Sequence, residues 1–134
     1  MRAAVVAALS PLHAFAVENP ALPGTPDIYT LAGWIETKWM REWPKRPSTR
    51  VKVKRFSPEQ RAWLRRHAAC GGRAWVLLAV NREWLLLDGE LAADRLDYTT
   101  RRELLGVASE VWQTKDEALP GLLRKLRVHA PSRL

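Results

Sequence analysis

The sequence predicts a single α/β domain in which helices cover a mixed β-sheet. The chain has 134 residues, a length that suits one domain with its own hydrophobic core. Its composition, 47% hydrophobic and 27% charged, is that of an ordinary globular protein. Segments with helix-forming composition alternate with segments that have the apolar runs or two-residue alternation of strands. Together these observations favour a sheet flanked by helices.

The N-terminal part is predicted to form one helix and three short strands. Residues 1–9 consist largely of Ala, Val and Leu and end at Ser10-Pro11, which favours a short helix. A loop rich in proline and glycine follows at 20–26, and Ala32-Gly33 suits a tight turn. We therefore expect strands over 13–18, 27–31 and 34–39.

The remainder of the chain is predicted to contain three helices and two further strands. Ser57 and Gln60 have the spacing of a capping box, with Pro58 at the first helical position, which predicts a helix from 58 to about 70. The apolar run within 73–80 predicts a strand buried on both faces. We also expect a strand over 84–87 and helices over 100–109 and 115–126, and we interpret 1–90 as the core and 91–134 as a C-terminal helical extension.

The composition restricts the classes of ligand. The single cysteine, Cys70, allows neither an intrachain disulfide nor a cysteine metal cluster, and the three histidines are scattered. Any metal is therefore expected to be a hard cation held by carboxylates. The formal net charge of +8 favours an anionic partner, of which nucleic acid is the commonest.

Residues 1–16 have two interpretations. Arg2, the apolar run 3–9 and Ala14-Phe15-Ala16 imitate a signal peptide with its cleavage site. The apolar run is short and is broken by Ser10-Pro11, however, and a helix buried against a sheet accounts for the same residues. We therefore expect the protein in the cytoplasm of a bacterium or of a phage-infected cell, and we expect no membrane-spanning segment.

The most informative residues are Asp27, Glu36 and Lys38. A hairpin that turns at Ala32-Gly33 brings Asp27, at the start of one strand, near the outer half of the next strand. Glu36 and Lys38 are two residues apart on that strand and share a face. Two carboxylates and an ammonium then converge, a set that suits phosphodiester hydrolysis. Asp27, Glu36 and the carbonyl of Thr37 are oxygen ligands for Mg²⁺, and Lys38 can hold the attacking water.

A basic stretch follows these residues directly. Glu42 is the only acid in residues 38–55, a segment rich in Lys and Arg. A solvated basic loop is one interpretation, but its place after the candidate site favours contact with DNA phosphates. The residues expected to contact DNA are Arg41, Trp43, Lys45, Arg46, Arg50, Lys52 and Lys54.

Pro26-Asp27, followed after eight residues by Glu36-Thr37-Lys38, resembles the PD-(D/E)XK motif of the restriction-endonuclease-like nucleases. The resemblance covers roughly residues 14–80 and includes the basic stretch and a helix that carries Gln60. Holliday-junction resolvases and VRR-NUC domains show similar arrangements. The resemblance implies an α-β-β-β-α-β core, dependence on Mg²⁺ with Mn²⁺ as a substitute, and cleavage of DNA.

The resemblance also assigns two further residues. It adds Gln60 to the catalytic residues Asp27, Glu36 and Lys38, although Gln60 also suits the capping box. Many relatives carry a glutamate on the first helix, whereas residues 1–9 contain no acid. Glu18 is the only acid before Asp27. It is therefore the candidate for a third metal-binding carboxylate, and its alternative role is an ion pair with Arg or Lys.

The seven tryptophans are expected to lie mostly in the core. Trp39 and Trp43, which lie among basic residues, can instead stack on bases. Of the two, Trp43 is the first choice because its sequence neighbours have an exposed character.

The function expected from the sequence is a Mg²⁺-dependent endonuclease that acts on Holliday junctions or other branched DNA in recombination, repair or phage DNA processing. Because a resolvase needs two active sites, we expect a homodimer, with residues 97–126 as the candidate dimer surface. Two alternatives stay open. One is a basic DNA-binding module whose carboxylates are structural, and the other is a secreted basic protein that begins at Val17.

Overall fold

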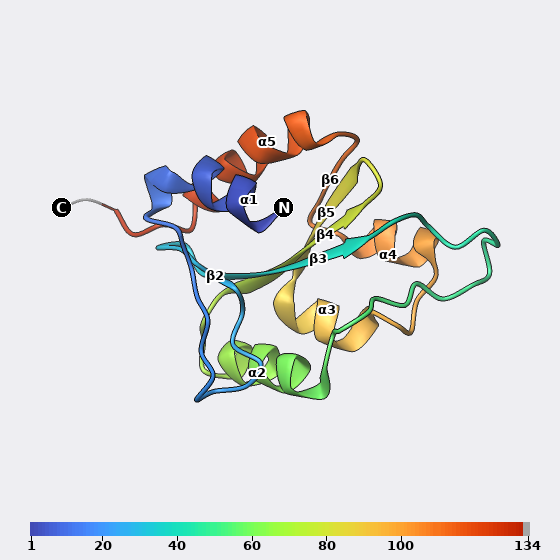
Figure 1. The fold of residues 1–134 in the computed structure, drawn as a ribbon, viewed down its shortest axis with the longest axis horizontal. Helices are drawn as coiled ribbons and strands as arrows, with labels where there is room; N and C mark the ends of the chain where they lie inside the picture. Colours follow the sequence, from blue (N-terminus) through green and yellow to red (C-terminus); the bar gives the residue numbers. More distant parts are fainter. Residues whose placement is uncertain (133–134) are drawn as a thin grey trace.

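A mixed sheet runs through the centre of the protein, with strands in the order β1-β2-β3-β4-β5-β6 (Figure 1). The computed structural model describes residues 1–132, and within them six strands and five α-helices form an α/β fold. Strands β3 and β4 are parallel, and each other neighbouring pair is antiparallel. The strands are β1 (Phe15–Ala16), β2 (Ile28–Tyr29), β3 (Trp34–Met40), β4 (Ala74–Val80), β5 (Glu83–Asp88) and β6 (Glu110–Trp112).

Helices cover both faces of this sheet. On one face lie α1 (Arg2–Ala8) and α5 (Lys115–Arg127), with the short 3-10 helix η1 (Ser10–Leu12) after α1. On the other face lie α2 (Pro58–Ala69), α3 (Gly89–Arg95) and α4 (Arg101–Val107). Helix α2 connects the parallel strands β3 and β4, as a parallel pair requires a crossover.

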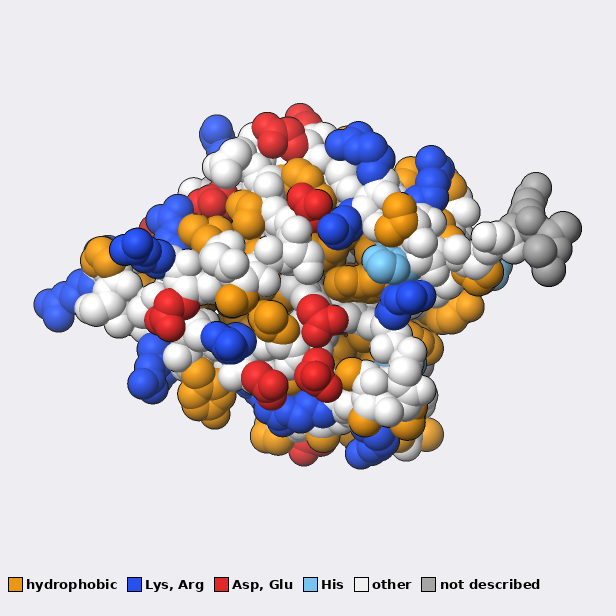
Figure 2. Space-filling model, turned by 180° about the vertical axis from the view of Figure 1, so that it is seen from behind, with side chains coloured by type: hydrophobic (Ala, Val, Ile, Leu, Met, Phe, Trp, Pro, Cys, Tyr) orange, Lys and Arg blue, Asp and Glu red, His pale blue; other side chains and the backbone are white. Residues whose placement is uncertain are grey.

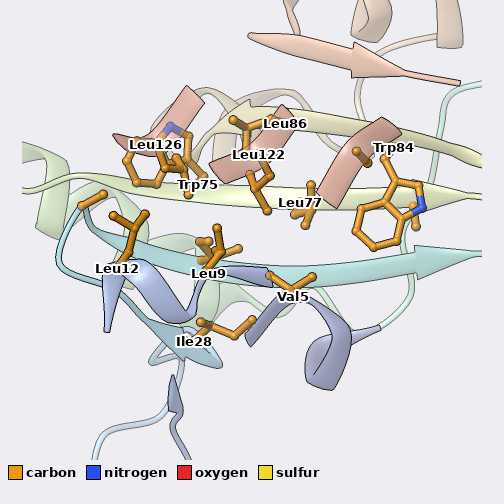
Figure 3. Close-up of a cluster of buried hydrophobic side chains, with 14 residues drawn as sticks. Val5, Leu9, Leu12, Ile28, Trp75, Leu77, Trp84, Leu86, Leu122 and Leu126 are labelled. Atoms are coloured by element: carbon orange, nitrogen blue, oxygen red, sulfur yellow. The ribbon is translucent and has the colours of Figure 1, made fainter. Parts of the chain in front are cut away.

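Each face has its own hydrophobic core. In the first, shown in Figure 3, Val5 of α1, Leu9 directly after it and Leu122 of α5 pack against Leu77 and Leu86 of the sheet. The second places Leu64 of α2 and Leu104 of α4 against the opposite side chains of β4 and β5. All seven residues of β4 are buried, as its apolar sequence predicted.

The first helix and the long third strand are confirmed, but the strands expected at 13–18 and 27–31 shorten to two residues each. Thr30 gives the reason at the turn. Its Oγ1 donates to the carbonyl of Gly33 at 2.7 Å and accepts from the backbone N–H groups of Ala32 and Gly33. The backbone groups of Thr30 and Gly33 also bond to each other, at 3.0 and 3.2 Å, and close the turn around Leu31 and Ala32, so the β2–β3 ladder ends after Tyr29.

Helix α3 and strand β6 were not expected. Helix α3 follows β5 without a loop, because the last residue of the strand, Asp88, is also the N-cap of the helix. Its side chain accepts from the N–H of Leu91 at 3.2 Å. Strand β6 is three residues long and half-buried, so it lacks a strong apolar pattern. It extends the sheet beyond β5.

The segment interpreted as a C-terminal extension is integrated in the domain. Ala118, Leu122 and Leu126 of α5 are fully buried in the first core, and Leu104 of α4 is fully buried in the second. These four residues of 97–126 thus pack against their own chain. In residues 1–132 no helix has the length and apolar character needed to cross a membrane.

The basic stretch divides into two halves. Residues 41–50 extend away from the sheet, as Figure 1 shows for the loop after β3. Residues 51–56 are anchored instead: Val51 and Val53 are buried, and Val51 exchanges backbone hydrogen bonds with Thr99 and Asp97. The valines that alternate with Lys52 and Lys54 point into the second core, so this half of the basic stretch is part of the packed domain.

Candidate active site

Glu36 and Lys38 lie side by side on β3 and are buried. Their side chains share the face of the sheet that α2 covers, as their two-residue spacing predicted. Only 5% of Glu36 and 8% of Lys38 is exposed. The ammonium Nζ of Lys38 lies 3.1 Å from Oε2 of Glu36, so each buried charge has a partner of opposite sign. Buried charges without such a partner are strongly unfavourable.

Gln60 bridges this pair and caps α2 at the same time. Its Oε1 accepts from Nζ of Lys38 at 3.0 Å and from the backbone N–H of Ser57 at 3.0 Å. Its Nε2 donates to Oε2 of Glu36 at 3.2 Å. The capping box directs the Gln60 side chain back toward the start of the helix, where β3 presents Glu36 and Lys38. Gln60 therefore completes the capping box and contacts both Glu36 and Lys38.

The third partner of Lys38 is a backbone carbonyl. The carbonyl of Arg55 accepts from Nζ at 2.8 Å. Arg55 has φ of +62°, a left-handed conformation that residues other than glycine adopt infrequently. An ammonium has three donors, and Glu36, Gln60 and Arg55 accept all three. Lys38 is therefore held in one position.

Asp27 lies against the edge of β3, just before β2 begins. Its Oδ1 accepts from the backbone N–H of Thr37 at 3.1 Å, and its Oδ2 accepts from Oγ1 of Thr37 at 2.6 Å. The N–H and C=O of one strand residue point to the same side of the strand, so the Thr37 carbonyl also faces this edge. The hairpin thus brings Asp27 to the part of β3 that carries Glu36 and Lys38.

The two carboxyl groups have raised pKa values. Burial and, to a smaller extent, the negative charge of Asp27 raise the pKa of Glu36 to about 7, although Lys38 acts in the opposite direction. Burial also raises the pKa of Asp27, against the hydrogen bonds from Thr37. Two carboxylates that repel each other in a desolvated place are stabilised in their charged forms by a bound cation.

The donors fit a hard divalent cation. Asp27, Glu36 and the Thr37 carbonyl offer oxygen atoms, which Mg²⁺ prefers, and Mg²⁺ is commonly held by only one or two carboxylates. No cluster of three or more His, Cys, Asp or Glu side chains forms within residues 1–132. The structure does not bring Glu18 into the group: its side chain is 84% exposed and lies 3.9 Å from Arg2. The ion pair, the alternative considered for Glu18, is the contact observed.

Gly24 sets the position of the loop that carries Asp27. It has φ of +88°, and a Cβ there would lie 2.3 Å from the carbonyl oxygen of Glu59 in the first turn of α2. Only a glycine allows the loop to approach the helix this closely. The contact places Asp27 and the capping residue Gln60 at a defined separation.

We expect Gly24→Ala to lower the free energy of unfolding by about 3 kcal/mol, since it adds a steric clash to the strain of a positive φ. Gly71→Ala is the matched control. Gly71 has φ of +84° but no atom within 4 Å of the added Cβ, so about 1 kcal/mol is expected there. Urea unfolding of both variants measures the difference, and equal losses would contradict the role given to the contact.

A basic hollow of about 590 Å³ opens beside Thr37 and Lys38. Arg41, Lys52 and Lys54 line it, all three exposed. Lys45, Arg46 and Arg50 are exposed on the projecting part of the same loop. Figure 2, which views the opposite side of the molecule, shows Lys and Arg side chains gathered at the end where this loop lies. The hollow therefore offers a positive surface next to the buried carboxylates.

Trp43, the first choice for stacking on bases, is held in the protein. It is half-buried, its indole N–H donates to Oε1 of Glu83 at 2.9 Å, and Arg101 lies 4.9 Å from the centre of its ring. Trp39 is 62% exposed. Trp39 is therefore the more exposed of the two tryptophans, because contacts with β5 and α4, which are distant in sequence, hold Trp43.

Two contributors to the site were not identified from the sequence. The carbonyl of Arg55 has no residue-specific signal, since every residue has a carbonyl. The two-residue period of a strand puts the Thr37 side chain on the face opposite to Glu36 and Lys38, and its hydroxyl reaches Asp27 at the strand edge. No protein-family model matches this chain, and a search of curated proteins finds no match. The chemical assignment of the site therefore depends on its geometry.

Proposed function

We propose that this protein is a metal-dependent endonuclease of the restriction-endonuclease-like class that hydrolyses DNA. The observation that carries the proposal is the buried cluster of Glu36, Lys38 and Gln60 beside Asp27, next to a basic hollow. A buried carboxylate with a pKa near 7 and a fixed ammonium are costly for stability, and perturbed groups of this kind concentrate at functional sites.

In this proposal Asp27, Glu36 and the Thr37 carbonyl hold Mg²⁺ or Mn²⁺. The bound ion supplies a Lewis acid that polarises the phosphate and offsets the charge developing on its oxygens. Lys38 holds the attacking water or a phosphoryl oxygen through the N–H of its ammonium that contacts Glu36 in the unbound protein. Gln60 and the Arg55 carbonyl keep the ammonium in place meanwhile.

The DNA backbone lies along the hollow lined by Arg41, Lys52 and Lys54 in this proposal, with Lys45, Arg46 and Arg50 in further phosphate contacts. Such contacts bind DNA without reading its sequence, which suits a nuclease directed by structure, at Holliday junctions or other branches. Cutting both strands of a branch requires two sites, so the proposal includes a homodimer in the cytoplasm.

The test is cleavage of a labelled four-way junction, a flap and a linear duplex in Mg²⁺, Mn²⁺ or EDTA. We expect Asp27→Asn to reduce metal-dependent cleavage at least about 100-fold, the upper range seen on removing a partner of a metal ligand. Asp94→Asn, which changes an exposed aspartate paired with Arg65, is the matched control and is expected to cut normally. DNA binding without cleavage by the wild type in either metal would refute the enzyme and favour a DNA-binding module.

A further inference from the structure

Trp39 is exposed although the strand that carries it is not. Of the seven residues of β3, Trp39 alone is exposed, at 62%. In the part of the chain that the structure describes, β2 pairs with β3 only at Trp34 and Ile35. Asp27 contacts this edge at Thr37, and beyond that residue no strand of residues 1–132 pairs with it, where the Trp39 side chain is exposed.

The Trp39 side chain lines two hollows. One is the basic hollow, which Lys52 and Lys54 also line. The other, of about 500 Å³, lies on the α1 and α5 side of the sheet and includes Arg82 and Lys115. Each hollow also contains one acid, Glu42 in the first and Asp116 in the second. An exposed aromatic ring on a surface that carries cations suits single-stranded nucleic acid, since bases stack on the ring and phosphates contact the cations.

Trp39 also lies near the candidate active site. Thr37, whose amide and hydroxyl hold Asp27, precedes it by two residues on the same face of β3. Two residues of an extended strand span about 7 Å, a distance that one nucleotide can bridge. Lys38 is its direct neighbour in sequence.

We propose that Trp39 stacks on an unpaired base of DNA whose backbone enters the candidate active site. The inference rests on the proposed nuclease function and specifies its substrate, which is DNA with unpaired bases at the cleavage point. In a fully paired duplex both faces of each base are stacked on its neighbours, so the indole has no free base to contact. Trp43 does not take this role, because Glu83 and Arg101 hold it.

The experiment measures DNA binding in EDTA, so that no cleavage takes place. The probes are a labelled single strand, a duplex with a short single-stranded gap, and a fully paired duplex. We expect Trp39→Ala to weaken binding of the single strand and the gapped duplex about 10-fold, and binding of the paired duplex less than about twofold. Trp39→Phe retains an aromatic face and is expected to recover most of the affinity.

The matched control is Tyr98→Ala. Tyr98 is an aromatic residue of similar exposure, 64%, that lines neither hollow, and its loss is expected to leave all three affinities unchanged. Trp39→Leu keeps an apolar side chain without an aromatic face, and it provides the same comparison where the alanine variant fails to fold. Equal affinities of wild type and Trp39→Leu for gapped DNA would overturn the inference.

The two proposals fail in different ways. A wild type that binds gapped DNA through Trp39, but cuts no probe in Mg²⁺ or Mn²⁺, refutes the nuclease and supports the stacking role. Cleavage that depends on Asp27, combined with binding that is indifferent to Trp39, supports the nuclease and overturns the stacking role. A loss that is equal for gapped and paired DNA also overturns it.

Discussion

Replacing Glu36 by glutamine is expected to abolish cleavage and, above pH 7, to make the metal-free protein more stable. Glutamine keeps the size of the side chain and an oxygen that accepts from Lys38 or Gln60, but it removes the charge that the proposed metal ion requires. We expect the rate of cleavage to fall roughly 10³-fold, the upper end of the cost of removing one electrostatic contact to a transition state. A site that exists for function commonly lowers stability in this way.

The stability change depends on pH, and the sign follows from the raised pKa of Glu36. The pKa of the Glu36 carboxyl is about 7 in the folded protein, against its ordinary value of 4.5. Its contribution to folding stability is therefore fully present below pH 4.5 and is lost as the pH rises through 7. From this difference we expect Glu36→Gln to be more stable than the wild type by about 3 kcal/mol at pH 8, and by little at pH 4.

Urea unfolding in EDTA between pH 4 and pH 9 measures this effect. Glu90→Gln is the control, because the Glu90 side chain is exposed. Addition of Mg²⁺ is expected to stabilise the wild type but not Glu36→Gln, a readout that does not depend on DNA. Parallel pH profiles for wild type and Glu36→Gln would show that Glu36 is not a destabilising carboxylate.

Replacing Lys38 by methionine is expected to cause the largest loss of stability of any change at the site. It removes the ammonium that donates to Glu36, to Oε1 of Gln60 and to the carbonyl of Arg55. Breaking one partner of a buried ion pair commonly costs about 3–5 kcal/mol, because the other charge stays buried. We expect a loss near 3 kcal/mol at pH 8 that becomes smaller toward pH 4, where Glu36 is neutral.

Thermal and urea unfolding of Lys38→Met, Glu36→Gln and the double variant measure the coupling between the two residues. The double variant is expected to recover part of the loss, since it leaves no buried charge. Arg65→Met is the matched control, because it breaks an ion pair with Asp94 in which both side chains are about half exposed. This change is expected to lower the free energy of unfolding by less than about 1 kcal/mol. A similar cost for Lys38→Met would contradict the structural role of the buried ammonium.

The sequence by itself determined the elements whose patterns are local. The helix at 58–70 followed from its capping box, and the buried strand at 73–80 from its continuous apolar run. The shared face of Glu36 and Lys38 followed from the two-residue period of a strand. A local sequence pattern predicts only the element that contains it. The strand pattern was weaker for β6 and for the two-residue strands β1 and β2.

Only the tertiary structure decided how these elements complete the site. Gln60 could be a cap or a site residue from its sequence, and it is both because β3 packs beneath the first turn of α2. Arg55 contributes a carbonyl, a group that every residue has, and Trp43 is held by Glu83, forty residues away. Contacts between segments distant in sequence set these partners. The sequence therefore identified Glu36, Lys38 and Gln60 as candidates, and the packing of α2, β3 and the basic loop determined how they lie.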